Sequence, residues 1–386
     1  MAPPIVTSSI PVSVPQLSGN EWKYVKECLD SGWISSAGPY VTKFEDQFAK
    51  RIGTSQAVAV VSGTAALHIS LLLSGVVPED EVIVPTITFI APVNTVRYVG
   101  ANPIFMDCDD FLNIDPEKTK EFCETECFFD GTDLINKKTK AKIKAIVLVH
   151  VLGTPVDIAP FLRLAEKYRL KIIEDAAESL GSFYQTGPAQ GKQTGTIGDF
   201  GCFSFNGNKL VTAGGGGMIV AKSEEALQRA RYYTTQAKDD GERFLHHQIG
   251  YNYRLNNLQA AMGCAQLEQL DDFLRIKREN FSLYQESLAG IPGTQLLEEP
   301  EYGQSNYWLY TLRVDERTYG RSTRELKQAL KSAGIETRLI WHPNHLQNPY
   351  RRYQTYRLEQ SQDTQKKYLN LPSSLSLKPE DIQYVS

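Results

Sequence analysis

The sequence has no excess of charge of either sign, and it has no long apolar run. Its 386 residues include 41 basic and 45 acidic side chains, for a formal net charge of −4. Because nucleic-acid surfaces are strongly basic, this balance argues against a nucleic-acid partner, although it leaves room for a local positive pocket that binds a small anion. The most apolar helical stretch, residues 65–77, is too short and too interrupted to cross a bilayer.

Signals for export, disulfides and metals are equally sparse. The first 16 residues have neither the charged start nor the long apolar core of a secretion signal, so we expect a cytoplasmic protein without membrane association. The six cysteines are scattered, and a chain of this size does not need disulfides. Cys123 and Cys127 could share one face of a helix, yet no nearby His or second Cys pair completes a metal site. We therefore predict free thiols and no bound metal.

What the sequence does contain is a regular alternation of apolar strands and helices. With 41% hydrophobic and 22% charged residues, its composition is that of a globular protein. The predicted strands are residues 57–61, 81–84, 103–107, 145–150 and 171–175, and the predicted helices include residues 91–98 and 158–168. Continuous apolar strands separated by helices predict an α/β fold with a mostly parallel sheet covered on both faces.

The pattern changes in the C-terminal third of the chain, which is long enough for more than one core. A long helical stretch, residues 255–288, leads into a second unit. This unit has predicted strands near residues 307–314 and 336–340 and a predicted helix at residues 323–333. We predict a large domain of residues 1–265 and a smaller C-terminal α/β domain of residues 266–386, with the boundary inside the helical stretch. The charge-rich segment 119–144 is interpreted as a solvated connection.

One lysine stands out because of its surroundings. Lys209 follows an apolar strand-like run, residues 199–205, and precedes four glycines, Gly214–Gly217, that lead into a second apolar run. Most lysines are solvated, but a lysine in this setting would be partly buried, and its amine could attack a carbonyl. The natural carbonyl partner is pyridoxal phosphate, bound as a Schiff base. The glycines would let the backbone pass close to that cofactor, or they form only a tight turn.

Two further motifs lie where parallel α/β sheets place their chemistry, after the carboxyl ends of strands. Ser62-Gly63-Thr64 joins a predicted strand to a helix, whose first N–H groups suit a phosphate; the alternative is an ordinary helix N-cap. Asp175 ends a strand among apolar residues, so its carboxylate needs a partner. A protonated pyridine nitrogen would supply one, and the alternative is a buried Asp that caps the next turn. Ser204 could donate its hydroxyl to the same phosphate.

These motifs recur together, in this order, in one family. They are Ser62-Gly-Thr, Thr88-Phe-Ile-Ala, Glu174-Asp-Ala-Ala-Glu-Ser, Ser204-Phe-x-x-x-Lys, the glycine run and Gly250-Tyr-Asn-Tyr-Arg-Leu-Asn. The sequence resembles the DegT/StrS-type nucleotide-sugar aminotransferases, which depend on pyridoxal phosphate. The resemblance extends from Gly32-Trp-Ile-Ser-Ser-Ala-Gly to Asn370-Leu-Pro-Ser-Ser. The resemblance implies fold type I, the aspartate aminotransferase architecture, and a homodimer whose active sites are shared across the interface.

The resemblance also implies roles for individual residues. Lys209 would form the internal aldimine and move a proton between cofactor and substrate, Asp175 would bind the pyridine nitrogen, and Phe89 would pack on the ring face. Asn252 would reach the phosphate of the neighbouring subunit. Glu178 lies at a position near the ring hydroxyl where many relatives have Gln or His. The remaining cofactor-binding residues would be Gly63, Thr64, Ala65, Ser204 and Asn206.

The amino-acid sequences of three segments indicate a substrate class. Residues 174–181, 205–209 and 344–347 look most like the enzymes that aminate C4 of UDP-4-keto-6-deoxy-N-acetylhexosamines in legionaminic acid and bacillosamine pathways. The resemblance implies glutamate as the amino donor and pyridoxamine phosphate as the intermediate form of the cofactor. A dTDP- or GDP-linked keto sugar is the alternative substrate.

Substrate residues are predicted in one loop near the C-terminus. Arg338, His342 and His345 lie where the family contacts the sugar nucleotide. Arg338 would bind the carboxylate of glutamate or a diphosphate, or it forms a surface salt bridge. His345 would contact the substrate, or it is a packed structural histidine. A sugar dehydratase on this scaffold would carry histidine in place of Lys209, and a non-catalytic regulator would not need both Lys209 and Asp175.

Overall fold

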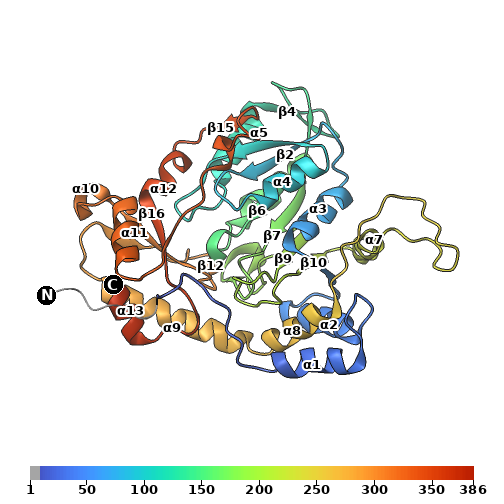
Figure 1. The fold of residues 1–386 in the computed structure, drawn as a ribbon. Coiled ribbons are helices and arrows are strands. Elements are labelled where there is room, and N and C mark those ends of the chain that lie inside the picture. Colours follow the sequence, from blue (N-terminus) through green and yellow to red (C-terminus); the bar gives the residue numbers. More distant parts are fainter. Residues whose placement is uncertain (1–8) are drawn as a thin grey trace.

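The computed structural model describes residues 9–386, and its centre is one large sheet (Figure 1). Its strands are β1 (Val58–Val60), β2 (Glu81–Pro85), β3 (Asn102–Met106), β4 (Cys127–Phe129), β5 (Leu134–Asn136), β6 (Lys142–Val149), β7 (Lys171–Asp175), β9 (Phe200–Ser204), β10 (Gly217–Ala221) and β15 (Thr355–Tyr356). The order along the sheet is β1-β10-β9-β7-β6-β2-β3-β15. Along this order only β10 runs antiparallel to its neighbours.

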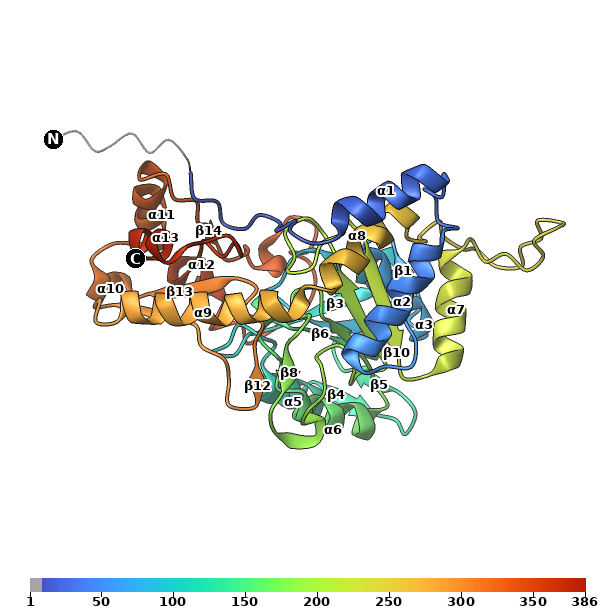
Figure 2. The same ribbon diagram turned by 90° about the horizontal axis from the view of Figure 1, so that it is seen from below.

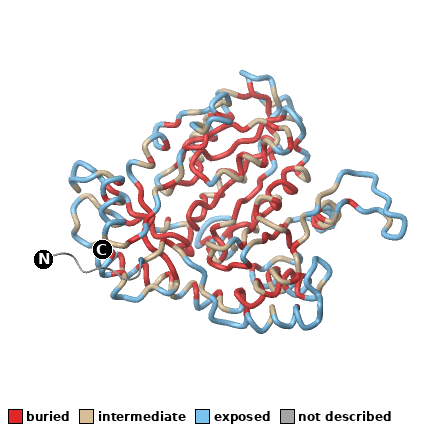
Figure 3. Tube along the Cα trace, in the orientation of Figure 1, coloured by how far each residue is buried: buried red, intermediate tan, exposed pale blue. Residues whose placement is uncertain are grey.

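Both faces of the large sheet are buried. In β2, Val82 and Val84 pack into one hydrophobic cluster, and Ile83 between them packs into another. Figure 3 shows these strands as the buried centre of the large part of the molecule. The alternation follows from strand geometry, because successive side chains point to opposite faces. The prediction of a mostly parallel α/β sheet is therefore confirmed.

Helices cover the two faces (Figures 1 and 2). One face carries α3 (Gly63–Leu73), α4 (Ala91–Tyr98) and α7 (Glu224–Thr234). The other face carries α1 (Glu21–Ser31), α2 (Pro39–Ile52) and α8 (Asn257–Leu267), and further along it α5 (Pro116–Thr125) and α6 (Ile158–Tyr168). Phe44 and Phe48 of α2 pack edge-on against Phe205 and Phe203 at the end of β9, which ties this face to the segment that leads to Lys209.

The C-terminal part is built on a second, antiparallel sheet. Its strands, in spatial order, are β11 (Thr294–Leu296), β13 (Tyr310–Val314), β16 (Tyr368–Leu371) and β14 (Arg338–Leu339). The long helix α9 (Leu270–Leu288) packs beside it with α11 (Thr323–Ser332) and α13 (Pro379–Val385), around a core that includes Phe281, Tyr284 and Leu369. Shorter elements are β8 (Phe183–Tyr184), β12 (Gly303–Gln304), α10 (Glu316–Tyr319) and α12 (Thr364–Lys367).

The structure departs from the expected elements in two places. Residues 255–288 form two helices, because α8 ends at Leu267 and α9 begins at Leu270. The segment 119–144 is not merely a solvated connection, since its β4–β5 hairpin pairs with the start of β6. Leu134 and Cys127 point into the core cluster beneath α5 and α6. The many lysines of this segment conceal a short alternating pattern that is half-buried.

The cysteines and the chain ends complete the description. All six cysteines are buried and unpaired, and Cys123 and Cys127 lie on α5 and β4 rather than on one helix. Within residues 9–386, no cluster of His, Cys, Asp and Glu side chains could hold a metal ion, and no helix is both long and apolar enough to cross a membrane. The segment considered for a secretion signal lies partly outside the described residues.

The predicted domain boundary, between residues 265 and 266, falls near the end of α8. Segments cross it in both directions. Ile10 pairs with Ile335 and packs against the core of the smaller sheet, while β15 joins the large sheet beside β3. A division of the chain at this position stays a prediction.

Candidate active site

The carboxyl ends of the parallel strands meet in one cavity of about 410 Å³, which the smaller sheet closes from the other side. Ligands bind at this edge in open α/β sheets, because the loops after the strands converge there. Nine of the residues predicted from the sequence line the cavity. They are Gly63, Thr64, Phe89, Asp175, Glu178, Ser204, Asn206, Lys209 and Arg338.

One end of the cavity is the start of α3. Ser62 caps this helix, because its Oγ accepts a hydrogen bond from the N–H of Ala65 at 3.1 Å. A Cβ on Gly63 would lie 3.0 Å from the Cβ of Ser204, so the close approach of α3 to β9 favours glycine. The first turn of α3 and the hydroxyls of Thr64 and Ser204 together form an end suited to phosphate. The helix cap and the anion site therefore coexist.

Asp175 occupies the end of β7 and is only 5% exposed. Within the described residues its carboxylate accepts one hydrogen bond, from the N–H of Ala177 at 3.0 Å. Burial raises the pKa of Asp175 to about 7, the nearby Glu178 carboxylate raises it too, and Lys209 opposes both. A buried carboxylate with so little compensation is stabilised by a cation placed against it. Asp175 thus caps a turn and still presents an unsatisfied acid to the cavity.

Lys209 lies in the cavity between a carboxylate and an indole ring. Its Nζ is 3.3 Å from Oε1 of Glu178, and the other oxygen of Glu178 accepts the N–H of Leu152 at 2.9 Å. The same Nζ is 4.1 Å from the centre of the Trp308 ring, whose Nε1 donates to the carbonyl of Asn208 at 2.8 Å. Because its side chain is only 13% exposed, the amine has a defined position close to Asp175.

The smaller sheet supplies the opposite wall. Arg338 on β14 and Asn370 on β16 are register partners, and both line the cavity. Asn370 is 3% exposed, and its Oδ1 accepts the hydroxyl of Thr311 at 2.8 Å, which leaves its amide as a donor. None of the ion pairs found within residues 9–386 includes Arg338. This wall therefore offers N–H donors to an anionic ligand.

Four of the predicted residues lie outside the cavity lining. The Nδ1 of His345 is 2.7 Å from the hydroxyl of Thr86, and burial lowers the pKa of this half-buried ring. His345 thus has a partner within the protein, and its contact with the substrate stays a prediction; His342 is exposed beside it. Ala65 is buried in α3 and contributes its N–H to the cap. Asn252 is exposed.

Trp308 and Asn370 were missed as site residues. Trp308 sits in an apolar strand pattern, where an aromatic residue is ordinarily a core residue, and no local signal separates it from one. Asn370 belongs to the C-terminal motif Asn370-Leu-Pro-Ser-Ser, which supported the family resemblance but carried no role. Both reach the cavity only because the smaller sheet folds over the strand ends.

Comparison with known proteins identifies the family. The sequence pattern of the DegT/DnrJ/EryC1/StrS aminotransferase family matches residues 15–386. The chain belongs to this family. GDP-perosamine synthase of Escherichia coli O157:H7 is 39% identical over 377 residues, which is 97% of this chain and 96% of that protein. The GDP-perosamine synthase of Caulobacter vibrioides is 37% identical over 380 residues, with the same coverage.

A solved structure agrees. The putative sugar aminotransferase Spr1654 of Streptococcus pneumoniae, in its pyridoxal phosphate form, has a TM-score of 0.85 at 25% identity and covers 98% of this chain and 96% of its own. This DegT/StrS-family protein is a sugar aminotransferase that depends on pyridoxal phosphate. The cavity fits that cofactor, since it combines a helix start suited to an anion, a buried acid with a single hydrogen bond and a lysine amine.

Proposed function

We propose that this protein transfers the amino group of glutamate to the C4 ketone of a GDP-linked keto sugar. The observation that carries the proposal is the placement of the Lys209 amine beside Glu178, in one cavity with Asp175. Support for the nucleotide comes from the two relatives named as GDP-perosamine synthases, each matched over 97% of this chain. The sequence favoured a UDP-linked N-acetylhexosamine, but these relatives favour the GDP alternative.

The residues of the cavity hold the cofactor in a fixed orientation. Bound pyridoxal phosphate supplies an aldehyde carbon, which can take up an amino group, and a ring, which accepts electrons when a proton leaves the substrate carbon. Gly63, Thr64 and Ser204 would bind the phosphate at the start of α3. The carboxylate of Asp175 would pair with the ring nitrogen, and that pairing would lower its raised pKa and keep it ionised. Phe89 would cover one ring face.

Lys209 would bind the aldehyde carbon of the cofactor through Nζ. Once Nζ is released from that carbon, the amine would move a proton between the cofactor and the substrate. Its Nζ lies 3.3 Å from Oε1 of Glu178 and 4.1 Å from the centre of the Trp308 ring. Both contacts keep Nζ inside the cavity between proton transfers. A positioned acid–base group of this kind contributes about 10²–10⁴-fold in rate.

Arg338 and Asn370 would bind the anionic part of the substrates. Their donors face the cavity from the wall opposite Asp175, and both lie on strands of the smaller sheet. The two candidate anions are the carboxylate of glutamate and the diphosphate of the sugar nucleotide. Arg338→Gln separates them, since loss of the first raises the KM for glutamate and loss of the second raises the KM for the keto sugar.

A homodimer that shares its sites is part of the proposal. The segment between α7 and α8 extends away from the body of the molecule (Figure 1). It exposes Phe244, Leu245 and Ile249, a set of apolar side chains that a partner would cover. Asn252 lies in this segment, three residues after Ile249, and is itself exposed, so it would reach the phosphate in a second copy. Sedimentation velocity of the wild type and of Ile249→Asp tests the assembly, and the proposal requires a dimer that the substitution weakens.

The function is tested by an assay across GDP-, dTDP- and UDP-linked 4-keto sugars with glutamate as the donor. We expect the highest kcat/KM with a GDP-linked sugar, and NMR of the product should show the new amine at C4. Preference for a UDP-linked N-acetylhexosamine would overturn the choice of nucleotide. Amination of keto acids alone would overturn the sugar substrate itself.

A further inference from the structure

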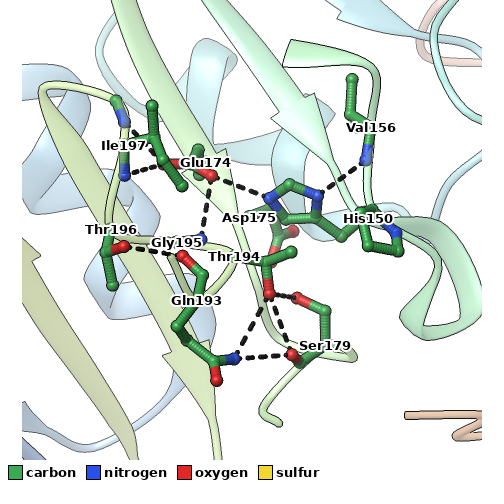
Figure 4. A network of polar contacts seen from close by, with 12 residues as sticks. His150, Val156, Glu174, Asp175, Ser179, Gln193, Thr194, Gly195, Thr196 and Ile197 are labelled. Atoms are coloured by element: carbon green, nitrogen blue, oxygen red, sulfur yellow. Dashed lines mark hydrogen bonds and ion pairs between the residues drawn. The ribbon is translucent and has the colours of Figure 1, made fainter. Parts of the chain in front are cut away.

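A second buried carboxylate lies next to Asp175 in the chain. Glu174 is fully buried, and its two oxygens accept four hydrogen bonds (Figure 4). Oε2 accepts Nε2–H of His150 at 3.0 Å and the N–H of Gly195 at 2.9 Å. Oε1 accepts the N–H groups of Ile197 and Gly198 at 2.7 and 2.6 Å. Burial raises the pKa of Glu174, but the bond from His150 and these N–H groups lower it below its ordinary value, so the group is a carboxylate.

The surroundings of His150 fix which of its nitrogens carries the proton. The N–H of Val156 donates to Nδ1 at 3.1 Å, so Nδ1 is unprotonated and Nε2 donates to Glu174. The backbone N–H of His150 donates to the carbonyl of Asp175 at 3.1 Å. One histidine at the end of β6 therefore holds the side chain of Glu174 and the main chain of Asp175.

The loop of residues 193–198, which bonds Glu174, also reaches the far end of the same segment. Thr194 donates its hydroxyl to the carbonyl of Ser179 at 2.9 Å and also contacts the Ser179 hydroxyl at 2.8 Å. Gln193 donates its amide to the Ser179 carbonyl at 3.0 Å. Segment 174–179 is thus held at both ends by one loop, and the two cavity carboxylates, Asp175 and Glu178, lie between the holding points.

We propose that Glu174, His150 and the 193–198 loop form a clamp that positions Asp175 and Glu178 against the cofactor ring and Lys209. The proposal rests on the role given above to Asp175 at the ring nitrogen. Because the Asp175 carboxylate has a single hydrogen bond of its own, its location depends on the backbone on either side. The clamp touches neither the cofactor nor the substrate, so its members are positioning residues.

Glu174→Gln is the sharpest test, because it preserves shape and removes one acceptor. If the side-chain oxygen of the new glutamine takes the place of Oε1, the side-chain NH₂ takes the place of Oε2. It then faces two donors, the ring of His150 and the N–H of Gly195. His150 cannot adapt by moving its proton to Nδ1, since that nitrogen already faces the N–H of Val156. The substitution therefore forces the loop or the strand end to move. Thr194→Val is a milder second variant that releases only the Ser179 end.

The matched control is Asp107→Asn. Asp107 is another fully buried carboxylate, and it accepts Lys118 Nζ and the N–H groups of Gln360 and Ser361, away from the cavity lining. For each variant we would add pyridoxal phosphate back to the cofactor-free protein. The measurements are the Kd of the cofactor, the pH midpoint of its visible absorbance when bonded to lysine, and the Tm.

The expected result for Glu174→Gln is a Kd raised about 10–100-fold, the range seen when a partner that orients a metal ligand is lost, with a shifted pH midpoint. Thr194→Val should change both in the same direction and less. Asp107→Asn should lower the Tm and leave Kd and midpoint unchanged. The clamp is refuted if Glu174→Gln and Thr194→Val lower only the Tm, as the control does. Asp175→Asn is measured alongside: if it shifts neither quantity, the role of Asp175 fails first and the clamp with it.

Discussion

Two lysines contact different groups of Trp308, one its indole ring and the other its main-chain carbonyl. Lys209 Nζ lies over the indole ring, in the cavity, with the Glu178 carboxylate beside it. Lys277 Nζ donates to the main-chain carbonyl of Trp308 at 2.9 Å and to the carbonyl of Ser373, and its residue is only 2% exposed. Burial lowers the pKa of Lys277 to about 7. The Lys209 amine faces the space open to a ligand, whereas the Lys277 amine joins α9 to two loops.

The difference shows that burial of a lysine does not by itself indicate chemistry. Lys277 is the more buried of the two, yet it lines no part of the cavity, and its acceptors are backbone carbonyls. Lys209 is less buried but faces Asp175 and the anion-binding start of α3. A carboxylate neighbour and open space for a ligand are therefore the features that support the role proposed for Lys209. The following substitutions test whether the two lysines divide activity and stability in this way.

The largest effect is expected for Lys209→Ala. It should lower kcat by at least about 10⁴-fold, because it removes both the amine that bonds the cofactor and the group that moves the proton. The visible absorbance of lysine-bonded cofactor should disappear while the Tm changes little. Lys277→Met should keep kcat within about tenfold. Comparable losses of kcat in the two variants would end the proposed division between the lysines.

Lys277→Ala should produce the largest loss of stability. It leaves a cavity and two buried carbonyls without their donor, which costs about 2–5 kcal/mol in the free energy of unfolding. Lys277→Met fills the same space, so it should restore the part of that loss that comes from the cavity, while the two carbonyls stay without their donor. Urea denaturation of both variants measures the difference. If Met is as destabilising as Ala, the carbonyl contacts outweigh packing.

The two lysines also mark what the sequence could and could not predict. Lys209 was found because a glycine run and an apolar strand flank it, and these are local signals. Lys277 lies in α9 among charged residues, where its spacing is that of a solvated helix face, and it is buried only because β13 and the 372–374 loop pack over it. Long-range packing of this kind leaves no local signal.

The same distinction holds for the fold and the site. Helices α4 and α6 and strand β7 were predicted at the residues where they occur, because apolar periodicity and strand-tip acids are local. The β4–β5 hairpin was missed, since surface lysines conceal its alternation. Asp175 and Ser204 came from strand ends, whereas Trp308 and Asn370 entered the cavity by closure of the smaller sheet. How the smaller sheet packs over the strand ends cannot be predicted from a single sequence.

The pH dependence of the free energy of unfolding should also distinguish the two lysines. Lys277 has a lowered pKa of about 7 in the folded protein, against an ordinary value of 10.5 when unfolded. Between these values the unfolded state binds more protons, so stability should rise with pH, by up to about 1.4 kcal/mol per pH unit. Lys277→Met should lack this slope, and Lys209→Ala should keep it. Urea denaturation at pH 7 to 10 measures this slope. Equal slopes in the wild type and in Lys277→Met would show that groups other than Lys277 cause the pH dependence.

The smallest effect is expected at the residue between the lysines. Trp308→Phe keeps an aromatic face near Lys209 but loses the Nε1 donor to Asn208 and part of the attraction for the amine. An exposed to partly buried cation–π contact is worth about 0.5–2 kcal/mol, and phenylalanine binds a cation less well than tryptophan. We expect kcat/KM to fall about 2–10-fold, and the Tm to fall as well, because Trp308 is only 3% exposed and packs in the core. A drop in Tm without a change in kcat/KM would show that Trp308 acts through packing alone, and the Lys209 amine would then depend on Glu178 alone for its position.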